Sequence, residues 1–422
     1  MNKGVNDLKI GEFSKKYQVP IDTVRYYIKL GLLLPEQKGQ FYFNHTCVED
    51  MELIQELKRY HFTLKEIHKI LSFKRVTSFN DMEDKKYYMR LLTRKKEELC
   101  HEIQDRQRSI GEIEEKIVSL DTEIGANNEG IPCGISPSFI ALLYCPYCFV
   151  NLDLHHLFIR EGGIVSGKLE CRCSYIATIQ DGILITPDHY NVYPDIYNVS
   201  LCIYDYERFE QFSSDFITLA ERGYSRIHKY LMKENHKPRT MIETNVNDAA
   251  FLPKYINSLS DENLYIFSCY SVETLQKLRK RIEQSKPDIQ ALYIANNNMK
   301  FPLKPNSIDV VIDSFSVNDI SLFYNFFPIE RLRSYLKDHV KVLGTHVYYD
   351  QHANSIRKIN KIFPNPHART YYPSYLKDNL EDCGFDIVSK EYIGSSDKPG
   401  DFFIYHATNE KLHMCFYIAE VG

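Results

Sequence analysis

The stretch VRYYIKLGLLLP, residues Val24–Pro35, sets an arginine and two tyrosines shortly before a glycine and a run of leucines. The preceding stretch IGEFSKKY, residues 10–17, has apolar side chains at helical spacing, and Pro20 interrupts that pattern. A second helix then fits the sequence as far as Leu30, and Gly31 suits the left-handed cap that ends many helices. The sequence therefore predicts a helix, a tight turn and a second helix.

The second of these helices has an apolar face and a polar face. Val24 and Ile28 face inward, whereas the outward-facing side chains are Thr23, Arg25, Tyr26 and Lys29. Arginine supplies a planar fork for phosphate and a tyrosine hydroxyl can donate to the DNA backbone, so this face suits a duplex. The stretch KGQFYFN, residues 38–44, then predicts a short β-wing, and further helices follow in VEDMELIQELKRY and LKEIHKIL.

The composition limits the classes of function. The chain has 422 residues, a net charge of −4, 44% hydrophobic residues and 26% charged residues, which indicates a globular protein of roughly two to four domains. We find no apolar run long enough to span a membrane and no signal peptide, so we expect a cytoplasmic protein without a membrane partner. Residues 1–75 hold 13 Lys and Arg against 9 Asp and Glu, a local balance of +4 that suits an anionic partner.

The order of these elements resembles the MerR family of bacterial transcription regulators. The matching stretches are IGEFSKKYQVPIDTVRYYIKLGLLLP, the wing, YHFTLKEIHKIL and the long helix after it, roughly the first 125 residues. The resemblance implies a recognition helix with Arg25, Tyr26 and Tyr27, Arg25 lying on backbone phosphate. It also implies a dimer that binds a near-palindromic double-stranded promoter and distorts its spacer, so that RNA polymerase is a partner only through the promoter.

The wing departs from the family at one position. Phe41 stands where family members usually carry an arginine, so that phosphate contact is either lost or supplied by Lys38. The full set of residues that we expect to contact DNA is Lys15, Lys16, Thr23, Arg25, Tyr26, Tyr27, Lys29, Lys38 and Tyr42.

Residues 80–124 predict one long helix without proline. A single apolar stripe runs along it at spacings of 3, 4 and 7, formed by Leu99, Ile103, Ile110, Ile113, Ile117, Leu120 and Ile124. Charged clusters between these positions suit the solvated face of a coiled coil, so we expect a homodimer. The alternative is that the helix packs against the chain's own C-terminal domain. The stretch GANNEGIPCGISP, residues 125–137, then predicts a loop and a domain boundary.

Four cysteines form two close pairs. They are Cys145 and Cys148 in YCPYC, and Cys171 and Cys173 in CRC. Two such knuckles suit a closed tetrahedral thiolate site, for which structural zinc is the usual metal because no position stays open for catalysis. Two alternatives are that His155 or His156 replaces one cysteine, and that the cysteines are buried without metal. The next stretch, SYIATIQDGILITPD, resembles an element of zinc ribbons associated with methyltransferases.

Residues 240–422 alternate strand-like and helical segments and predict a doubly wound α/β domain. PLKPNSIDVVIDSFSVND resembles a segment of class I S-adenosylmethionine-dependent methyltransferases. The resemblance implies that the cofactor cleft lies at Glu243, Asn245, Cys269 and Asn297. The loop IETNVNDAAFL lacks the glycine that the family uses there, and Cys269 and Asn297 stand where the family has acidic residues. We therefore expect no catalytic residues, and binding of S-adenosylmethionine is doubtful.

An emptied cofactor cleft near Tyr265, Tyr270 and Tyr293 could bind an unknown small-molecule effector. The complete interpretation is a multidomain α+β chain, a ligand-responsive regulator associated with the bacterial nucleoid. Its expected domains are a winged helix-turn-helix at 1–78, a coiled-coil dimerisation helix at 79–125, a zinc ribbon at 138–188 and a methyltransferase-like effector-binding domain at 189–422. The alternatives are an active methyltransferase tethered to DNA and a zinc sensor.

Overall fold

The computed structural model divides the chain into two compact units, Met1–Asn128 and Glu129–Gly422. The side chains of Lys38 and of residues 123–126 lie outside its description. The ranges whose backbone it describes are 8–77, 79, 81–126, 134–190, 210–234, 237–246 and 251–422.

The first unit begins with a helix-turn-helix. Its first four helices are α1 (Ile10–Tyr17), α2 (Ile21–Lys29), α3 (His45–Arg59) and α4 (Leu64–Thr77). Gln18 ends α1 in the left-handed region with φ of 53°, and Gly31 lies just after α2 with φ of 71°. Glycine adopts this conformation without a steric penalty, so the predicted left-handed turn at Gly31 is confirmed.

A small antiparallel sheet joins α2 to α3. Its strands are β1 (Leu8–Lys9), β2 (Glu36–Lys38) and β3 (Gln40–Phe43), in the order β1-β3-β2. Phe13 of α1 stacks on Phe43 of β3, with ring centroids 4.1 Å apart. Val24, Leu32 and Leu33 are fully buried in the same core, as expected from the apolar run after the recognition helix.

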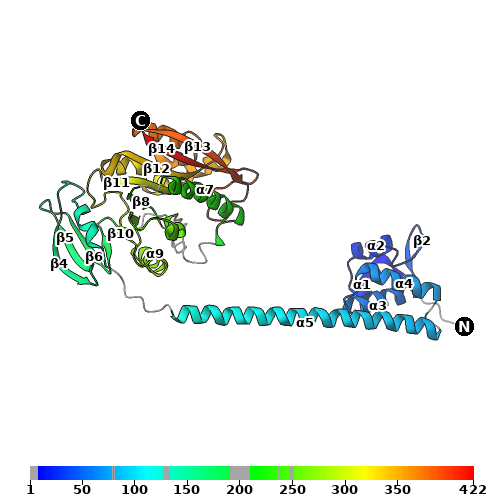
Figure 1. The fold of residues 1–422 in the computed structure, drawn as a ribbon. Coiled ribbons are helices and arrows are strands. Elements are labelled where there is room, and N and C mark those ends of the chain that lie inside the picture. Colours follow the sequence, from blue (N-terminus) through cyan, green and yellow to red (C-terminus); the bar gives the residue numbers. More distant parts are fainter. Residues whose placement is uncertain are drawn as a thin grey trace. The chain divides into compact units, whose positions relative to one another are not determined.

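The fifth helix of this unit, α5 (Met82–Ala126), continues for 45 residues, a length of about 68 Å. Figure 1 shows it as one unbroken helix that extends beyond α1–α4. Its first turns belong to the core of the unit, where Tyr87 packs on Phe73 of α4 with centroids 4.5 Å apart and Lys95 pairs with Glu66 at 3.1 Å. The stripe residues from Ile103 to Leu120 are exposed, and the side chain of Ile124 lies outside the described residues.

One eleven-stranded sheet organises the second unit, in the order β13-β14-β12-β11-β8-β9-β10-β7-β6-β5-β4. The strands are β4 (Asp153–Arg160), β5 (Gly163–Glu170), β6 (Ile176–Gln180), β7 (Ile183–Ile185), β8 (Thr240–Thr244), β9 (Leu264–Cys269), β10 (Ala291–Ala295), β11 (Ile308–Ser314), β12 (Leu336–Tyr348), β13 (Phe385–Ser396) and β14 (Leu412–Val421). The five strands β8 to β12 run parallel, and their order reverses between β8 and β11, as in doubly wound nucleotide-binding sheets.

Helices cover the two faces of this sheet. They are α7 (Ser214–Lys233), α8 (Leu252–Tyr255), α9 (Val272–Ser285), α10 (Ser316–Tyr324), α11 (Pro328–Leu332), α12 (Asn354–Ile362) and α13 (Tyr375–Asp382), with 3₁₀ turns at Pro137–Leu142, Ile256–Ser258, Arg333–Tyr335 and Pro366–Tyr371. Successive strand residues point to opposite faces, so Met241 joins one core with α7 and α9 while Ile242 joins the other with α13.

The four strands that carry the expected zinc ribbon are part of the same sheet. β7 pairs in parallel with β10, bringing Ile183 opposite Tyr293 and Ile185 opposite Ala295, while β4 to β7 pair with one another antiparallel. The ribbon strands therefore extend the doubly wound sheet at its β10 edge (Figure 1). No helix in the described ranges is both long and apolar enough to cross a membrane.

Candidate nucleic-acid interface, metal centre and cleft

The outer face of α2 carries exposed cationic and aromatic side chains. Arg25, Tyr26 and Lys29 are exposed, while Val24 on the opposite face is fully buried. Arg25 pairs with Asp22 at 3.2 Å, and both side chains remain largely open to solvent, so the pair contributes little stability and leaves the guanidinium available. The face thus presents two positive charges and a phenol, groups that contact phosphate and base edges in DNA complexes.

Tyr27 does not belong to this face, which corrects the sequence prediction. It is only 3% exposed, its ring lies in the core, and its hydroxyl accepts a hydrogen bond from Lys58 Nζ at 3.1 Å. The reason is helical geometry, because position 27 lies three residues after the buried Val24 and shares its face. Tyr26 is the tyrosine that points outward, at 49% exposure.

The remaining expected DNA contacts lie on α1, at the start of α2 and on the hairpin. Lys15 and Lys16 are exposed in the last turn of α1, whereas Thr23 is half-buried. Tyr42 is half-buried on β3, and its hydroxyl accepts a hydrogen bond from Gln40 Nε2 at 2.6 Å. Lys38 ends β2, and its side chain lies outside the described residues.

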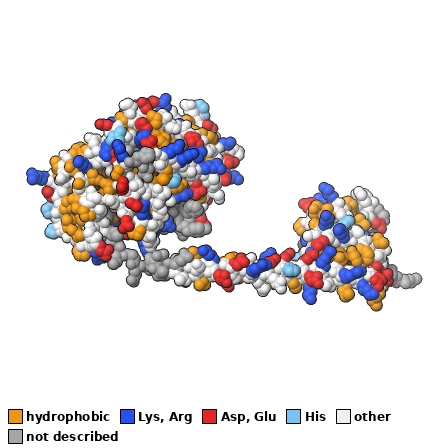
Figure 2. Space-filling model, viewed as in Figure 1, with side chains coloured by type: hydrophobic (Ala, Val, Ile, Leu, Met, Phe, Trp, Pro, Cys, Tyr) orange, Lys and Arg blue, Asp and Glu red, His pale blue; other side chains and the backbone are white. Residues whose placement is uncertain are grey.

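The described part of α5 presents its apolar stripe to solvent. Ile103, Ile110, Ile113 and Ile117 are 54–59% exposed. Red and blue side chains alternate along this helix in Figure 2, with hydrophobic side chains between them. A stripe with this spacing is typical of helices that pair in coiled coils.

The four cysteines predicted as metal ligands converge. Their sulfur atoms all lie within 4.8 Å of one another, and Cys145 Sγ is 3.5 Å from Cys173 Sγ. Four sulfurs around a tetrahedral zinc ion at about 2.3 Å each are separated by about 3.8 Å, so the spacing fits such an ion. In the described residues no histidine joins this group, and His155 instead lies 3.8 Å from Glu170.

The surroundings of these cysteines act on their thiols in opposite directions. Burial raises the pKa of Cys145, and hydrogen bonding with Cys173 raises the pKa of Cys148 to about 12. Cys145 is buried and accepts a hydrogen bond from the backbone N–H of Tyr147. The pKa of Cys173 is lowered to about 7, chiefly because the backbone N–H of Tyr175 donates to its sulfur. These donors favour the charged form of sulfur. The four cysteines can therefore hold a metal ion, and their donor set fits zinc.

The residues of the expected cofactor cleft lie at the carboxyl ends of β8, β9 and β10, but they are buried. Glu243, Asn245, Cys269 and Asn297 are 0%, 5%, 3% and 7% exposed. The expectation that they line an open pocket is therefore wrong. The reason is that the chain's own groups occupy the positions around them.

Both carboxylate oxygens of Glu243 accept hydrogen bonds from groups of the protein itself. One carboxylate oxygen accepts from the backbone N–H of Phe251 and from Ser314 Oγ, and the other accepts from the N–H of Leu252 at 2.8 Å. Burial raises the pKa of Glu243 to about 7 against these hydrogen bonds, which act to lower it. Its side chain thus fixes the start of α8, a short helix beside the end of β8.

A second buried acid lies at the end of β11, and the sequence analysis did not single it out. Asp313 accepts hydrogen bonds from Ser316 Oγ, the N–H of Val317 and the hydroxyl of Tyr417. Burial raises the pKa of Asp313 as well. Its position in IDVVIDSF, at the end of a strongly apolar strand, was the available signal.

The residues that directly follow β8 and β11 have a left-handed backbone conformation. Asn245 follows β8 with φ of 56° and Phe315 follows β11 with φ of 63°. Left-handed backbone is unfavourable for residues other than glycine, especially for a large side chain such as phenylalanine. Asn245 Nδ2 donates to Asp319 Oδ2 at 3.3 Å, which links the two strand ends further.

The segment that follows β7 closes the end of β10. Thr186 donates from its backbone to Ala295 O at 3.1 Å, the N–H of Asn297 donates to Asp188 O at 3.0 Å, and Asn297 Nδ2 donates to Tyr190 O at 2.6 Å. Asn297 is one of the residues that the resemblance placed in the cofactor cleft. Its amide is instead bonded to main-chain oxygens of this segment.

Two of the three aromatic residues expected beside the cleft lie elsewhere. Tyr265 is fully buried at the start of β9, and its hydroxyl donates to Ser260 O at 2.8 Å, so it lies at the opposite edge of the sheet. Tyr293 is 3% exposed and stacks on Phe267 inside one core. Tyr270, directly after β9, is half-buried near the expected place.

Comparisons with known proteins agree with the geometry of the first unit. The short first helix, the left-handed turn and the amphipathic α2 define residues 8–77 as a helix-turn-helix domain. Residues 8–74 match the model of the MerR HTH family regulatory protein. Over 67 residues the chain is 37% identical to the mercuric resistance operon regulatory protein of Bacillus cereus, a match covering 15% of this chain and 50% of that protein. Residues 8–74 are a MerR-type helix-turn-helix domain, and the chain spans about half of that relative.

Solved structures resemble the other part of the chain at low identity. YjhP from E. coli is 11% identical to this chain, with a TM-score of 0.39. The match covers 54% of this chain and 100% of YjhP. A SAM-dependent methyltransferase from Aquifex aeolicus is 13% identical, with 52% of this chain and 94% of that chain covered and a TM-score of 0.31. At these values we draw no conclusion about activity from either protein.

Proposed function

We propose that the protein is a transcription regulator that binds promoter DNA as a homodimer through α2. The observation that carries this proposal is the exposed cationic and phenolic face of α2 on a MerR-type domain. Arg25 and Lys29 neutralise phosphates, Tyr26 contacts the backbone or a base edge, and Lys15, Lys16, Tyr42 and Lys38 add contacts on both sides. The hairpin β2–β3 acts as the wing.

The dimer forms through α5 in this proposal. The exposed isoleucines 103, 110, 113 and 117 recur at spacings of 7, 3 and 4, the a and d positions of a heptad. Pairing two copies buries these side chains, and a twofold axis brings two α2 helices to two half-sites of a near-palindromic promoter. Distortion of the spacer between the half-sites then controls access of RNA polymerase.

Binding to a duplex that carries the gene's own upstream region tests the proposal. Fluorescence anisotropy at several salt concentrations should show affinity that falls steeply with salt. Arg25→Ala should weaken binding and reduce the slope of log K against log salt by about 0.9, because one phosphate contact is lost. A protein that ignores this duplex at low salt, or Arg25→Ala with unchanged affinity and slope, contradicts the proposal.

The metal centre is structural in this proposal. Zinc bound by Cys145, Cys148, Cys171 and Cys173 would have four thiolate ligands and no open position for a substrate. Cys145 lies in the core that also contains strands of the doubly wound sheet, so its loss is expected to disturb that sheet. A zinc sensor would instead release metal without losing its fold.

The second unit acts as a non-catalytic sensor in this proposal. Glu243, Cys269 and Asn297 are buried, and the amide of Asn297 is bonded to Tyr190 O, which leaves little access for S-adenosylmethionine. A small effector would bind at the same edge of the sheet, where Tyr190 is 59% exposed, and shift the dimer by binding its two states unequally. A thermal-shift screen of metabolites on the full chain would find such a ligand.

The alternative is an active methyltransferase. The doubly wound strand order and an acid at the end of the first parallel strand favour it. Isothermal calorimetry with S-adenosylmethionine separates the two proposals. Micromolar binding would support the enzyme, whereas no heat at millimolar ligand supports the sensor.

A further inference from the structure

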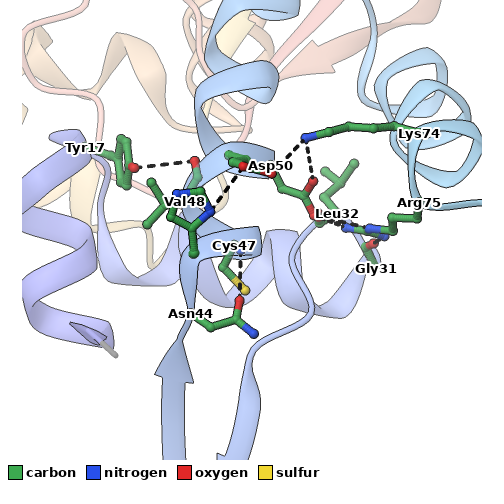
Figure 3. A network of polar contacts seen from close by, with 11 residues as sticks. Tyr17, Gly31, Leu32, Asn44, Cys47, Val48, Asp50, Lys74 and Arg75 are labelled. Atoms are coloured by element: carbon green, nitrogen blue, oxygen red, sulfur yellow. Dashed lines mark hydrogen bonds and ion pairs between the residues drawn. The ribbon is translucent and has the colours of Figure 1, made fainter. Parts of the chain in front are cut away.

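Arg75, in the last turn of α4, contacts the C-terminal end of the recognition helix. Its Nη1 donates to Gly31 O at 2.8 Å and its Nη2 donates to Leu32 O at 2.6 Å (Figure 3). These two carbonyls belong to the residues that turn the chain away from α2. The carbonyls at a helix end have no partner within the helix, so a guanidinium that binds them fixes where the helix ends.

Asp50 of α3 holds the same guanidinium from the other side. Its Oδ2 accepts from Arg75 Nη2 at 2.8 Å and from Nε at 3.2 Å, and Lys74 Nζ lies 3.6 Å from Oδ1. The Asp50 side chain is only 2% exposed, and that of Arg75 is 21% exposed. Figure 3 shows Arg75 lying between Asp50 and the loop that carries Gly31 and Leu32. Three helices of the domain therefore meet at one side chain.

A second contact from α4 reaches the same turn. Gly31 has φ of 71°, and a Cβ placed there would lie 3.3 Å from His68 Nε2. The turn after α2 is therefore closely packed against α4 by His68 and held to it by Arg75. We call the contacts of Arg75 with Asp50, Gly31 O and Leu32 O the clamp. α4 ends at Thr77 and α5 begins at Met82, so Arg75 lies shortly before the proposed dimerisation helix in the sequence.

We propose that Arg75 is a positioning residue for DNA recognition. It fixes α2 relative to α4 and α5, and thereby sets the angle at which Arg25, Tyr26 and Lys29 meet a duplex whose half-sites are separated by the dimer. This inference rests on the proposed function. Four of the five N–H groups of its guanidinium donate within the protein, so we assign Arg75 a positioning role and not a phosphate contact.

The salt dependence of binding separates positioning from phosphate contact. A residue that neutralises a phosphate contributes about 0.9 to the slope of log K against log salt, whereas a positioning residue contributes nothing to it. Loss of positioning should also reduce binding to the upstream duplex while binding to a scrambled duplex stays the same, because non-specific binding depends on phosphate contacts alone. A purely stabilising residue would change neither quantity in the folded protein.

The decisive variant is the double substitution Asp50→Asn with Arg75→Met. It removes the clamp without leaving a buried carboxylate unpaired, so the domain is expected to fold, which circular dichroism and thermal melting verify. We expect affinity for the upstream duplex to fall at least about tenfold, with an unchanged salt slope and unchanged affinity for the scrambled duplex. Arg75→Lys should lose less affinity for the upstream duplex than the double variant. An ammonium can bind one carbonyl but cannot span the two carbonyls and the carboxylate.

Two single variants complete the test. Asp50→Asn alone keeps the bonds from Arg75 to Gly31 O and Leu32 O, so most of the affinity should remain. Lys69→Ala removes one exposed positive charge from the same helix and should leave the affinity of the upstream duplex unchanged. Arg25→Ala serves as the positive control, with reduced affinity and a reduced slope.

The outcomes are distinguishable. If the wild-type protein binds, Arg25→Ala weakens binding and the folded double variant binds as tightly as wild type, the role of Arg75 is refuted and the proposed function stands. A slope reduced by about 0.9 in the double variant would also refute it, because Arg75 would then contact phosphate. If the wild-type protein itself ignores the duplex, the proposed function fails.

Discussion

The hydroxyl of Ser314 donates a hydrogen bond to the carboxylate of Glu243, which joins the ends of β11 and β8 at the point where the strand order of the sheet reverses. Doubly wound sheets bind their ligands in the crevice at this point. In this protein the crevice residues bind one another. The buried acid at its centre makes the stability of the second unit depend on pH.

Glu243→Gln should reduce that dependence, to which Asp313, whose pKa burial also raises, contributes in the same direction. The pKa of Glu243 is about 7 in the folded protein against 4.5 for a free side chain, so the folded state retains a proton that the unfolded state has released. Stability is therefore present at low pH and is lost as pH rises from about 5 to 8, by about 2 to 3 kcal/mol. Denaturant unfolding of wild type and Glu243→Gln at both pH values measures the difference. A constant difference between the two proteins across this range would contradict the prediction.

Aspartate at two positions of the α5 stripe should separate the dimer. Ile110→Asp with Ile117→Asp places four charges in the proposed interface, and each lost isoleucine removes about 1.5 to 3 kcal/mol of burial, so dimer affinity should fall by at least about 100-fold. Light scattering after size-exclusion chromatography measures the mass. Val118→Asp is the control, since Val118 is 65% exposed but lies off the stripe, and this variant should stay dimeric.

Removal of one cysteine ligand should abolish metal binding. Cys145→Ser is expected to reduce bound zinc from about one ion per chain to nearly none, and to lower the melting temperature of the second unit by more than about 5 °C. Elemental analysis and calorimetry check the two values. Cys100→Ser changes an exposed cysteine on α5 and should keep both unchanged. Full metal content in Cys145→Ser would exclude a four-cysteine site.

The two adjacent tyrosines of α2 should behave differently. Tyr26→Ala should weaken DNA binding several-fold without changing thermal stability, because its side chain is 49% exposed. Tyr27→Phe should leave DNA binding unchanged and cost about 0.5 to 1 kcal/mol of stability, since only the hydrogen bond from Lys58 is lost. Anisotropy and chemical denaturation of both variants give the comparison, and a DNA-binding defect confined to Tyr27→Phe would reverse the assignment.

The sequence was most informative where contacts are local. The helix-turn-helix, the turn at Gly31 and the burial of Leu32 and Leu33 all follow from spacing within about 25 residues. Tyr27 was misplaced because the family resemblance assigned both adjacent tyrosines to the DNA, although the inward-facing Val24 already puts position 27 on the buried face. The long helix follows from its unbroken apolar stripe.

The sequence was less informative where distant segments meet. Nothing near Asn297 indicates that its amide binds Tyr190 O, 107 residues earlier in the chain, and nothing near Arg75 indicates Gly31. The convergence of four cysteines could be inferred because their two pairs already match a known ligand spacing. The burial of the expected cleft residues could not be inferred, because it depends on how α8 and the segment after β7 pack against them.

The pairing of β7 with β10 has a practical consequence for dissecting this protein. A fragment that starts after residue 190 would present the bare edge of β10, including unpaired main-chain groups opposite Ile183 to Ile185. Bare edges of this kind recruit strands from other chains and cause aggregation. A fragment intended for crystals should therefore begin before Ile135 and keep strands β4 to β7 and the cysteine-bearing turns beside them attached.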